Sequence, residues 1–373
     1  MSRTREDILN LIDAGKKYRE QGAHYEALEC FQNALKLCKK VYGDEIANED
    51  FSIVYTSIGI GYCDLNEQCT ALEYFHKALG IRMLIHADTP NHPDLAKIYS
   101  NIGVVYQQIH NYGKALEYHI KALEIWKVAY TDTPNHPHLA MSYSGIGVAY
   151  HGLGDYIKAL ECYLKALEIR EVIYADTPNH PDLAKIYSNI GVVYDDLGDY
   201  TKALEYKIKT LKIWKVVYAG TPYHTALASV YDDVADAYVY LCDYNKAIEH
   251  YLKALEIWEV VYADTPNHRT LAMSYNIVGS AYSCLCDYSK AIEYYLKALE
   301  IRRVAYADTP NHPDLANSYN NIGNAYLKFG DHNKALEFLS KAYIIYKAIN
   351  TNGQYDDEIK KVEDVLKKLT DNN

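Results

Sequence analysis

The sequence lacks any apolar run that approaches the roughly 18–20 residues of a membrane-spanning helix. It also lacks a basic excess, because 38 Lys and Arg stand against 49 Asp and Glu and give a formal net charge of −11. Nucleic acids and anionic membranes bind basic faces, so we expect neither as a partner, and the acidic excess mildly favours a cationic ligand. No apolar segment precedes the first predicted helix, so no secretory signal is expected.

The familiar sequence motifs of catalysis are missing as well. No Gly-x-Ser-x-Gly, His-Glu-x-x-His or Walker sequence occurs. Gly145-x-Gly147 begins like a phosphate-binding loop, but Tyr150 holds the third glycine position and no strand is predicted before it. A catalytic set needs several different residues at one place, whereas the His, Asp and Glu of this chain follow a repeat. We therefore expect no enzymatic activity and no cofactor.

Cysteine is scattered rather than arranged in a framework. The eight Cys stand at irregular positions, and Cys284-x-Cys286 has no second pair at the spacing of a zinc site. Free thiols in a reducing compartment are the better interpretation. We expect a cytoplasmic protein, acting in its own cell or, if it is a delivered effector, in a host cytosol.

What the sequence contains is a period of 44 residues. The nineteen residues from Asp88 to Tyr106 return unchanged from Asp176 to Tyr194. One proline recurs throughout, at Pro90, Pro134, Pro178, Pro222, Pro266 and Pro310. A fixed period of this size is typical of a solenoid, in which each repeat packs mainly on its neighbours.

Each repeat predicts two helices joined by a tight turn. Pro93 suits a first helical position, and apolar residues follow it at helical spacing until the turn, which two copies write as Gly154-Asp155-Tyr156 and Gly198-Asp199-Tyr200. A glycine for close helix packing recurs in the first helices at 15, 59, 103, 147, 191, 279 and 323, with Ala235 as the substitute. The prediction is an all-α solenoid over residues 4–350, with eight antiparallel helix pairs, and a capping helix over 354–370. The repeats are placed at about 8–50, 51–92, 93–136, 137–180, 181–224, 225–268, 269–312 and 313–350.

Six histidines follow the same period and invite a metal hypothesis. They stand at 92, 136, 180, 224, 268 and 312. Neighbouring copies are separated by at least one helix spacing of about 8–10 Å, whereas zinc gathers its ligands at about 2.1 Å. We therefore expect no metal site, and a histidine that orders the loop before each first helix.

The pattern resembles the tetratricopeptide repeat. The order of aromatic, aliphatic, Gly, Tyr, Ala, aromatic and Ala in that family matches Tyr143, Ile146, Gly147, Tyr150, Ala159, Tyr163 and Ala166. The second-helix aromatic is replaced by His119 and Lys207 in two copies, and the long period is similar to that of kinesin light chain repeats. The resemblance implies a right-handed superhelix whose first helices line a concave groove that holds extended peptides or partner helices.

Groove positions vary between copies while core positions hardly do, which favours a uniform scaffold with a differentiated binding surface. Five aspartates are expected to attract Lys or Arg, and asparagines to bond a peptide backbone. Two Lys-x-x-x-Asn pairs have the spacing of a carboxylate clamp, but the next Asn would fall at Gly145, which disfavours capture of a C-terminal carboxylate. The predicted groove residues are Lys97, Asn101, Gln108, Lys185, Asn189, Asp195, Asp196, Asp232, Asp233, Asp236, Asn276, Asn317, Asn320, Asn321 and Asn324.

Two functional hypotheses follow. The favoured one is a non-enzymatic scaffold or adaptor that binds a basic or mixed-charge segment of another protein. The alternative is a structural spacer or self-assembling array, which leaves a homo-oligomer open. Charge reversal of the five aspartates, read out by binding, discriminates the two.

Overall fold

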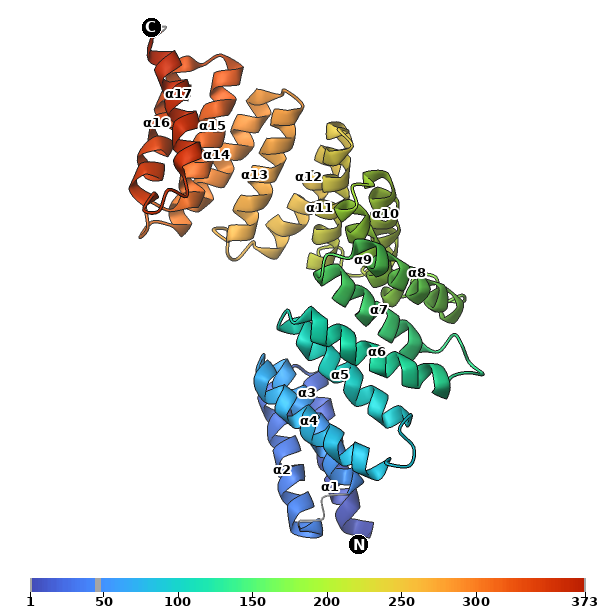
Figure 1. Ribbon diagram of the computed structural model, residues 1–373. Helices are drawn as coiled ribbons and strands as arrows, with labels where there is room; N and C mark the ends of the chain where they lie inside the picture. The colour runs from blue at the N-terminus through green and yellow to red at the C-terminus, as the bar shows by residue number, and fades with distance from the viewer. Residues whose placement is uncertain (1, 44–47, 372–373) are drawn as a thin grey trace. The chain divides into compact units, whose positions relative to one another are not determined.

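The computed structural model describes residues 2–43 and 48–371, and within them the chain forms seventeen α-helices and a series of short turns (Figure 1). The helices form eight antiparallel pairs followed by one C-terminal helix, as the period predicts. Their bounds are α1 Ser2–Glu20, α2 His24–Tyr42, α3 Glu49–Asp64, α4 Gln68–Ile85, α5 Pro93–Gln108, α6 Tyr112–Ala129, α7 Pro137–Gly152, α8 Tyr156–Ile173, α9 Pro181–Asp196, α10 Tyr200–Val217, α11 Thr225–Tyr240, α12 Tyr244–Val261, α13 Arg269–Cys284, α14 Tyr288–Ala305, α15 Pro313–Phe329, α16 His332–Ile349 and α17 Asp356–Asp371.

The chain divides into two compact units. The first runs to Pro178 and contains α1 to α8, and the second begins at Asn179 and contains α9 to α17. In each unit every odd-numbered helix packs on the even-numbered helix that follows it, and each pair packs on the next. The division of residues 4–350 into eight repeats with the boundaries given above stays a prediction.

Histidine begins the odd-numbered helices from α5 to α15. In each case the Nδ1 of the histidine accepts a hydrogen bond from the backbone N–H two residues later, at 3.3 Å for His92 and 3.1 Å for His312. This bond satisfies one of the free donors at a helix start. The prediction that the six histidines order the loops before the helices is confirmed.

The turn inside each pair needs a left-handed residue. Gly154 and Gly198 adopt φ of 79° and 77°, as predicted. The same turn position is held by His110 and Cys242 at φ of 57° and 58°, where a side chain costs about 1–2 kcal/mol. The copies of this turn thus differ in strain but share one backbone shape.

The glycine that recurs in the odd-numbered helices has a specific packing partner. A Cβ added to Gly147 would lie 2.6 Å from the ring of Tyr163, and one added to Gly103 would lie 2.8 Å from the ring of His119. In both pairs the ring comes from the even-numbered helix, sixteen residues later in the chain. The glycine therefore makes room for one side chain that crosses between the two helices, which is the physical reason for its recurrence.

The C-terminal helix closes the second core. Ile359 and Val362 of α17 are buried in the hydrophobic cluster of the second unit, with Leu366 and Leu369 packed against it. The four residues are those that the sequence places on one helix face. The helix begins at Asp356, two residues after the predicted boundary, and it packs on α16.

Candidate functional site

The odd-numbered helices present one face that their even-numbered partners do not cover. In α5, Lys97, Val104 and Gln108 are exposed and Asn101 is half-buried, whereas Ile102 on the opposite side is completely buried. We call this the odd-helix face and define it by residues 97, 100, 101, 104, 107 and 108 of α5 and their equivalents at steps of 44. All fifteen predicted groove residues occupy these positions.

Side chains of the even-numbered helices reach the same face from behind. The side chain that packs on the recurring glycine, sixteen residues after it, places its polar end on the odd-helix face. In one copy the Tyr295 hydroxyl donates to Ser280 Oγ at 3.1 Å. Tyr251 donates to Asp236 in the equivalent place. At Lys207 the crossing residue is a lysine, buried to 6% exposure, and its Nζ pairs with Asp195. The odd-helix face is therefore built by two helices per repeat, not one.

Four of the five predicted aspartates act on one another through their charges, in what we call the acidic cluster: Asp195, Asp232, Asp233 and Asp236. Lys207 is paired with Asp195 of α9, and its charge also acts on Asp233 of α11. Asp232 Oδ2 accepts a hydrogen bond from Trp258 Nε1 at 3.2 Å. Lys207 thus acts on two of the four carboxylates, Asp195 and Asp233. Asp196, the last residue of α9, is exposed, and its charge is not among the causes of the pKa shifts in the cluster.

Burial raises the pKa of two carboxyls in the acidic cluster, those of Asp232 and Asp233. The pKa of Asp232 is raised to about 7, chiefly by burial and further by the charges of Asp236 and Asp233, against the lowering effect of the Trp258 hydrogen bond. The pKa of Asp233 is also raised by burial, and the charges of Asp236 and Asp195 add to this while Lys207 opposes it. The cluster is therefore short of positive charge at neutral pH.

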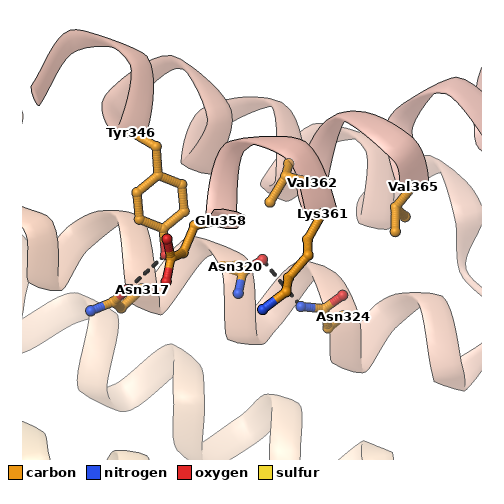
Figure 2. Close-up of a pocket in the computed structure, with 8 residues that line it drawn as sticks. All are labelled: Asn317, Asn320, Asn324, Tyr346, Glu358, Lys361, Val362 and Val365. Carbon is orange, nitrogen blue, oxygen red and sulfur yellow. Dashed lines mark hydrogen bonds between the residues drawn. The ribbon is translucent and has the colours of Figure 1, made fainter. Parts of the chain in front are cut away.

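The asparagines divide into two groups. Asn317, Asn320 and Asn324 of α15 line a cavity of about 410 Å³ whose other wall is Tyr346 of α16 and four residues of α17 (Figure 2). Asn321 lies outside this lining and donates to Asn276 Oδ1 of α13 at 3.0 Å. The four residues of α17 are Glu358, Lys361, Val362 and Val365.

The asparagine cavity is polar along one wall and mixed along the other. Tyr346 donates to Asn317 Oδ1 at 2.6 Å, and Asn324 donates to Asn320 Oδ1 at 3.1 Å. Figure 2 shows the Lys361 side chain extending from α17 toward Asn320 and Asn324. The asparagines retain donors and acceptors that these bonds do not use, so they can bond a peptide backbone.

The two Lys-x-x-x-Asn pairs lie in different units and have local partners. Lys97 Nζ lies 3.3 Å from Asp94 Oδ1, and Lys185 Nζ lies 3.3 Å from Asp182 Oδ1. Asn101 and Asn189 are half-buried beside them. Both lysines are exposed, so the ion pairs are weak and a ligand can compete for them.

Gly145, where a clamp would need asparagine, is explained by packing. A Cβ at this position would lie 2.7 Å from the ring of His119, which is buried between Gly103 of α5 and Gly145 of α7. Gln107 Nε2 donates to the Gly145 carbonyl at 2.7 Å. The His119 ring therefore occupies the space that an asparagine side chain at this position would need.

Sequence reasoning missed the residues that reach the odd-helix face from elsewhere. Lys207, Tyr251 and Trp258 support the acidic cluster, and Glu358 and Lys361 of α17 complete the asparagine cavity. One signal was available. Lys207 breaks a column of aromatic residues, and Asp195 at a nearby groove position supplies the compensating charge.

Comparison with known proteins agrees with this architecture. The tetratricopeptide repeat model matches residues 50–127, 94–171, 182–259, 226–303 and 270–348, and a second tetratricopeptide repeat model matches 18–45. No curated protein sequence matches the chain. No helix within residues 2–43 and 48–371 is long and apolar enough to cross a bilayer.

Three of the solved structures that are similar to this chain are the following. The C-terminal part of a TPR repeat-containing protein from Cytophaga hutchinsonii is 21% identical, with a TM-score of 0.55 over 83% of this chain and 98% of that one. BtubC (BKLC) from P. vanneervenii is 26% identical, with a TM-score of 0.49 over 63% and 91%. A putative kinesin light chain with nearly identical TPR-like repeats from Podosopora anserina is 18% identical, with a TM-score of 0.47 over 58% and 99%.

Tetratricopeptide repeats generally mediate protein–protein interactions on a scaffold that is typically non-catalytic. The family model covers well over half of the chain, and the described residues form eight helix pairs followed by one helix. The chain therefore belongs to the tetratricopeptide repeat family.

Proposed function

We propose that this protein is a non-catalytic adaptor that binds a basic or mixed-charge segment of a partner protein on the odd-helix face. The acidic cluster is the anchor, and it takes a Lys or Arg side chain of the partner. The asparagine cavity, in the same unit, is a second anchor that bonds the partner's backbone.

The observation that carries the proposal is the burial of the Asp232 carboxyl beside Asp233 and Asp236, which raises its pKa to about 7. Burying the carboxyls of Asp232 and Asp233 costs folding free energy at neutral pH, and stability alone would not select such an arrangement. A cation from a ligand would offset that cost, since a nearby positive charge lowers the pKa of each carboxylate. Binding a cation and ionising Asp232 are then coupled, so affinity should increase as the pH rises from 6 to 8.

Isosteric substitution tests the proposal better than charge reversal. The triple variant Asp232→Asn, Asp233→Asn and Asp236→Asn removes three charges and keeps Asp195 as the partner of Lys207. The matched control removes three charges from exposed positions of the same unit, with Asp264→Asn, Asp308→Asn and Asp364→Asn. Both variants should keep the helical circular dichroism of the parent.

Binding is measured by fluorescence polarisation with a panel of labelled 15-residue peptides rich in Lys and Arg, each paired with a version in which Glu replaces the basic residues. The parent should prefer basic peptides, and the cluster variant should bind its best peptide at least tenfold more weakly, whereas the control should stay within about twofold. Equal losses in the two variants would mean that only net charge matters, and the cluster would then not be the anchor.

A further inference from the structure

One linker in the first unit departs from the repeat in a way that assembles metal ligands. At the end of each even-numbered helix from α2 to α14 the chain places a tyrosine, at 42, 130, 174, 218, 262 and 306, but α4 is followed by His86. Beside it lie the capping His92 and Asp94 of α5. One donor atom from each of the three residues lies within 4.8 Å of the others. This histidine is thus added to a position where a second histidine and a carboxylate already stand.

The histidine at position 86 also leaves one imidazole nitrogen without a hydrogen bond. In the related linker of the second unit, the Tyr306 hydroxyl donates to Asp314 Oδ2 at 2.7 Å and its ring stacks on His312 with centroids 3.6 Å apart. His86 keeps the stacking, at 3.6 Å from His92, but its Nε2 is buried and has no hydrogen-bond partner. Buried polar atoms in proteins usually have a partner, so a buried imidazole nitrogen without one, near a carboxylate, indicates a place where a ligand can bind.

The linker holds these groups in place. The His86 N–H donates to the Arg82 carbonyl at 2.9 Å, and the loop is closed by bonds from Thr89 N–H to the His86 carbonyl and from His92 N–H to the Thr89 carbonyl. His92 Nδ1 lies 3.6 Å from Asp94 Oδ2. Tetrahedral ligands about 2.1 Å from an ion are about 3.4 Å apart. The His86 and His92 rings are stacked, so one of them must turn out of the stack before both can direct a nitrogen at the same ion.

Two cations compete for the carboxylate. Arg82 Nη1 lies 3.2 Å from Asp94 Oδ2, and Lys97 pairs with the other oxygen. Arg82 has alternative partners, because its Nη1 also lies 3.2 Å from Glu49 Oε1 and its Nε donates to Ser52 Oγ at 3.1 Å. An ion that takes Asp94 therefore leaves Arg82 paired, although the nearby positive charge limits the affinity.

We propose that His86, His92 and Asp94 form a binding site for one divalent transition-metal ion of the zinc class. Imidazole and carboxylate ligands suit Zn²⁺, and three protein ligands leave a fourth position open to water. The ion would join the end of α4 to the start of α5 and so brace the linker between these two helix pairs. The histidines of different repeats lie too far apart to share an ion, but His86 and His92 lie in one linker.

The matched control comes from the chain itself. His86→Tyr restores the residue of the other linkers, so it should fold normally, and it keeps all eight cysteines, which are free thiols and can bind Zn²⁺ on their own. Isothermal titration of the full chain with Zn²⁺ at pH 7.5, under reducing conditions, should show one equivalent in the parent that His86→Tyr loses or binds at least tenfold more weakly. Zn²⁺ should raise the melting temperature of the parent more than that of the variant.

A gain of binding completes the test. Tyr306→His completes the same set in the second unit, because it adds one histidine beside His312 and Asp314, with Arg302 in the place of Arg82. It should add one equivalent of Zn²⁺. If His86→Tyr binds Zn²⁺ with the stoichiometry and affinity of the parent, the ion is held by cysteines and the proposal is wrong. If Tyr306→His adds no equivalent, the three residues do not suffice and the proposal fails on that ground.

Discussion

Replacing Asp232 by asparagine should make the second unit more stable at neutral pH. Folding moves the pKa of this carboxyl from an ordinary 3.8 to about 7, so the native state retains a proton that the unfolded chain releases. The stability that this proton contributes is present in full below pH 3.8 and is lost as the pH rises toward 7. An asparagine carries no such dependence, and its side-chain oxygen can still accept from Trp258 Nε1.

The magnitude follows from the two pKa values. They differ by 3.2, and a difference of one corresponds to about 1.36 kcal/mol. The largest gain in the free energy of unfolding on replacing Asp232 is therefore about 4 kcal/mol at pH 8. Rearrangement of neighbouring side chains and water reduces this, so we expect Asp232→Asn to gain about 1–3 kcal/mol at pH 8. At pH 5 the gain should be less than half as large, because most of the carboxyl is still protonated in the native state.

Hydrogen exchange read by mass spectrometry suits this test, since arrays of repeats do not always unfold in one step. The amides of α11 and α12 should exchange more slowly in Asp232→Asn than in the parent at pH 8, after correction for the intrinsic rate. Asp264→Asn, in an exposed loop of the same unit, should change protection by less than about 0.5 kcal/mol. A gain that is the same at pH 5 and pH 8, or a loss at pH 8, would refute the reasoning.

Two further predictions concern the scaffold. His110→Gly should stabilise the first unit by about 1 kcal/mol, because φ at this turn is 57°, while Gly154→Ala at the equivalent turn should destabilise it by a similar amount, as urea unfolding will show. His119→Phe should remove part of the acid sensitivity of the first unit. Burial lowers the pKa of His119 to about 4, so the unfolded state takes up a proton first and stability is lost as the pH falls from 6.5 toward 4. Thermal unfolding at pH 5 and pH 7.5 should show a smaller difference in the variant than in the parent; equal differences would contradict this assignment.

The candidate site was partly readable from the chain. The period and the helical spacing assign all fifteen predicted residues to the positions that define the odd-helix face, because that spacing depends only on the 3.6-residue turn. That these residues bind a partner stays a prediction. The repeat pattern does not show which of these residues share hydrogen bonds or act on one another through their charges. Asn276 and Asn321 bond each other, Asn317 bonds Tyr346, and Asp196 lies apart from the pKa effects that connect the other four aspartates.

The sequence by itself determined the helices, their ends and their pairing. A histidine cap, a proline at the first helical position and a left-handed glycine act within two to five residues of the chain. Their effect therefore does not depend on the rest of the fold. Tertiary structure alone decided the chemistry of the site. Trp258 reaches Asp232 across 26 residues, Gln107 reaches Gly145 across 38, and the burial that raises the pKa of Asp232 exists only once neighbouring repeats have packed.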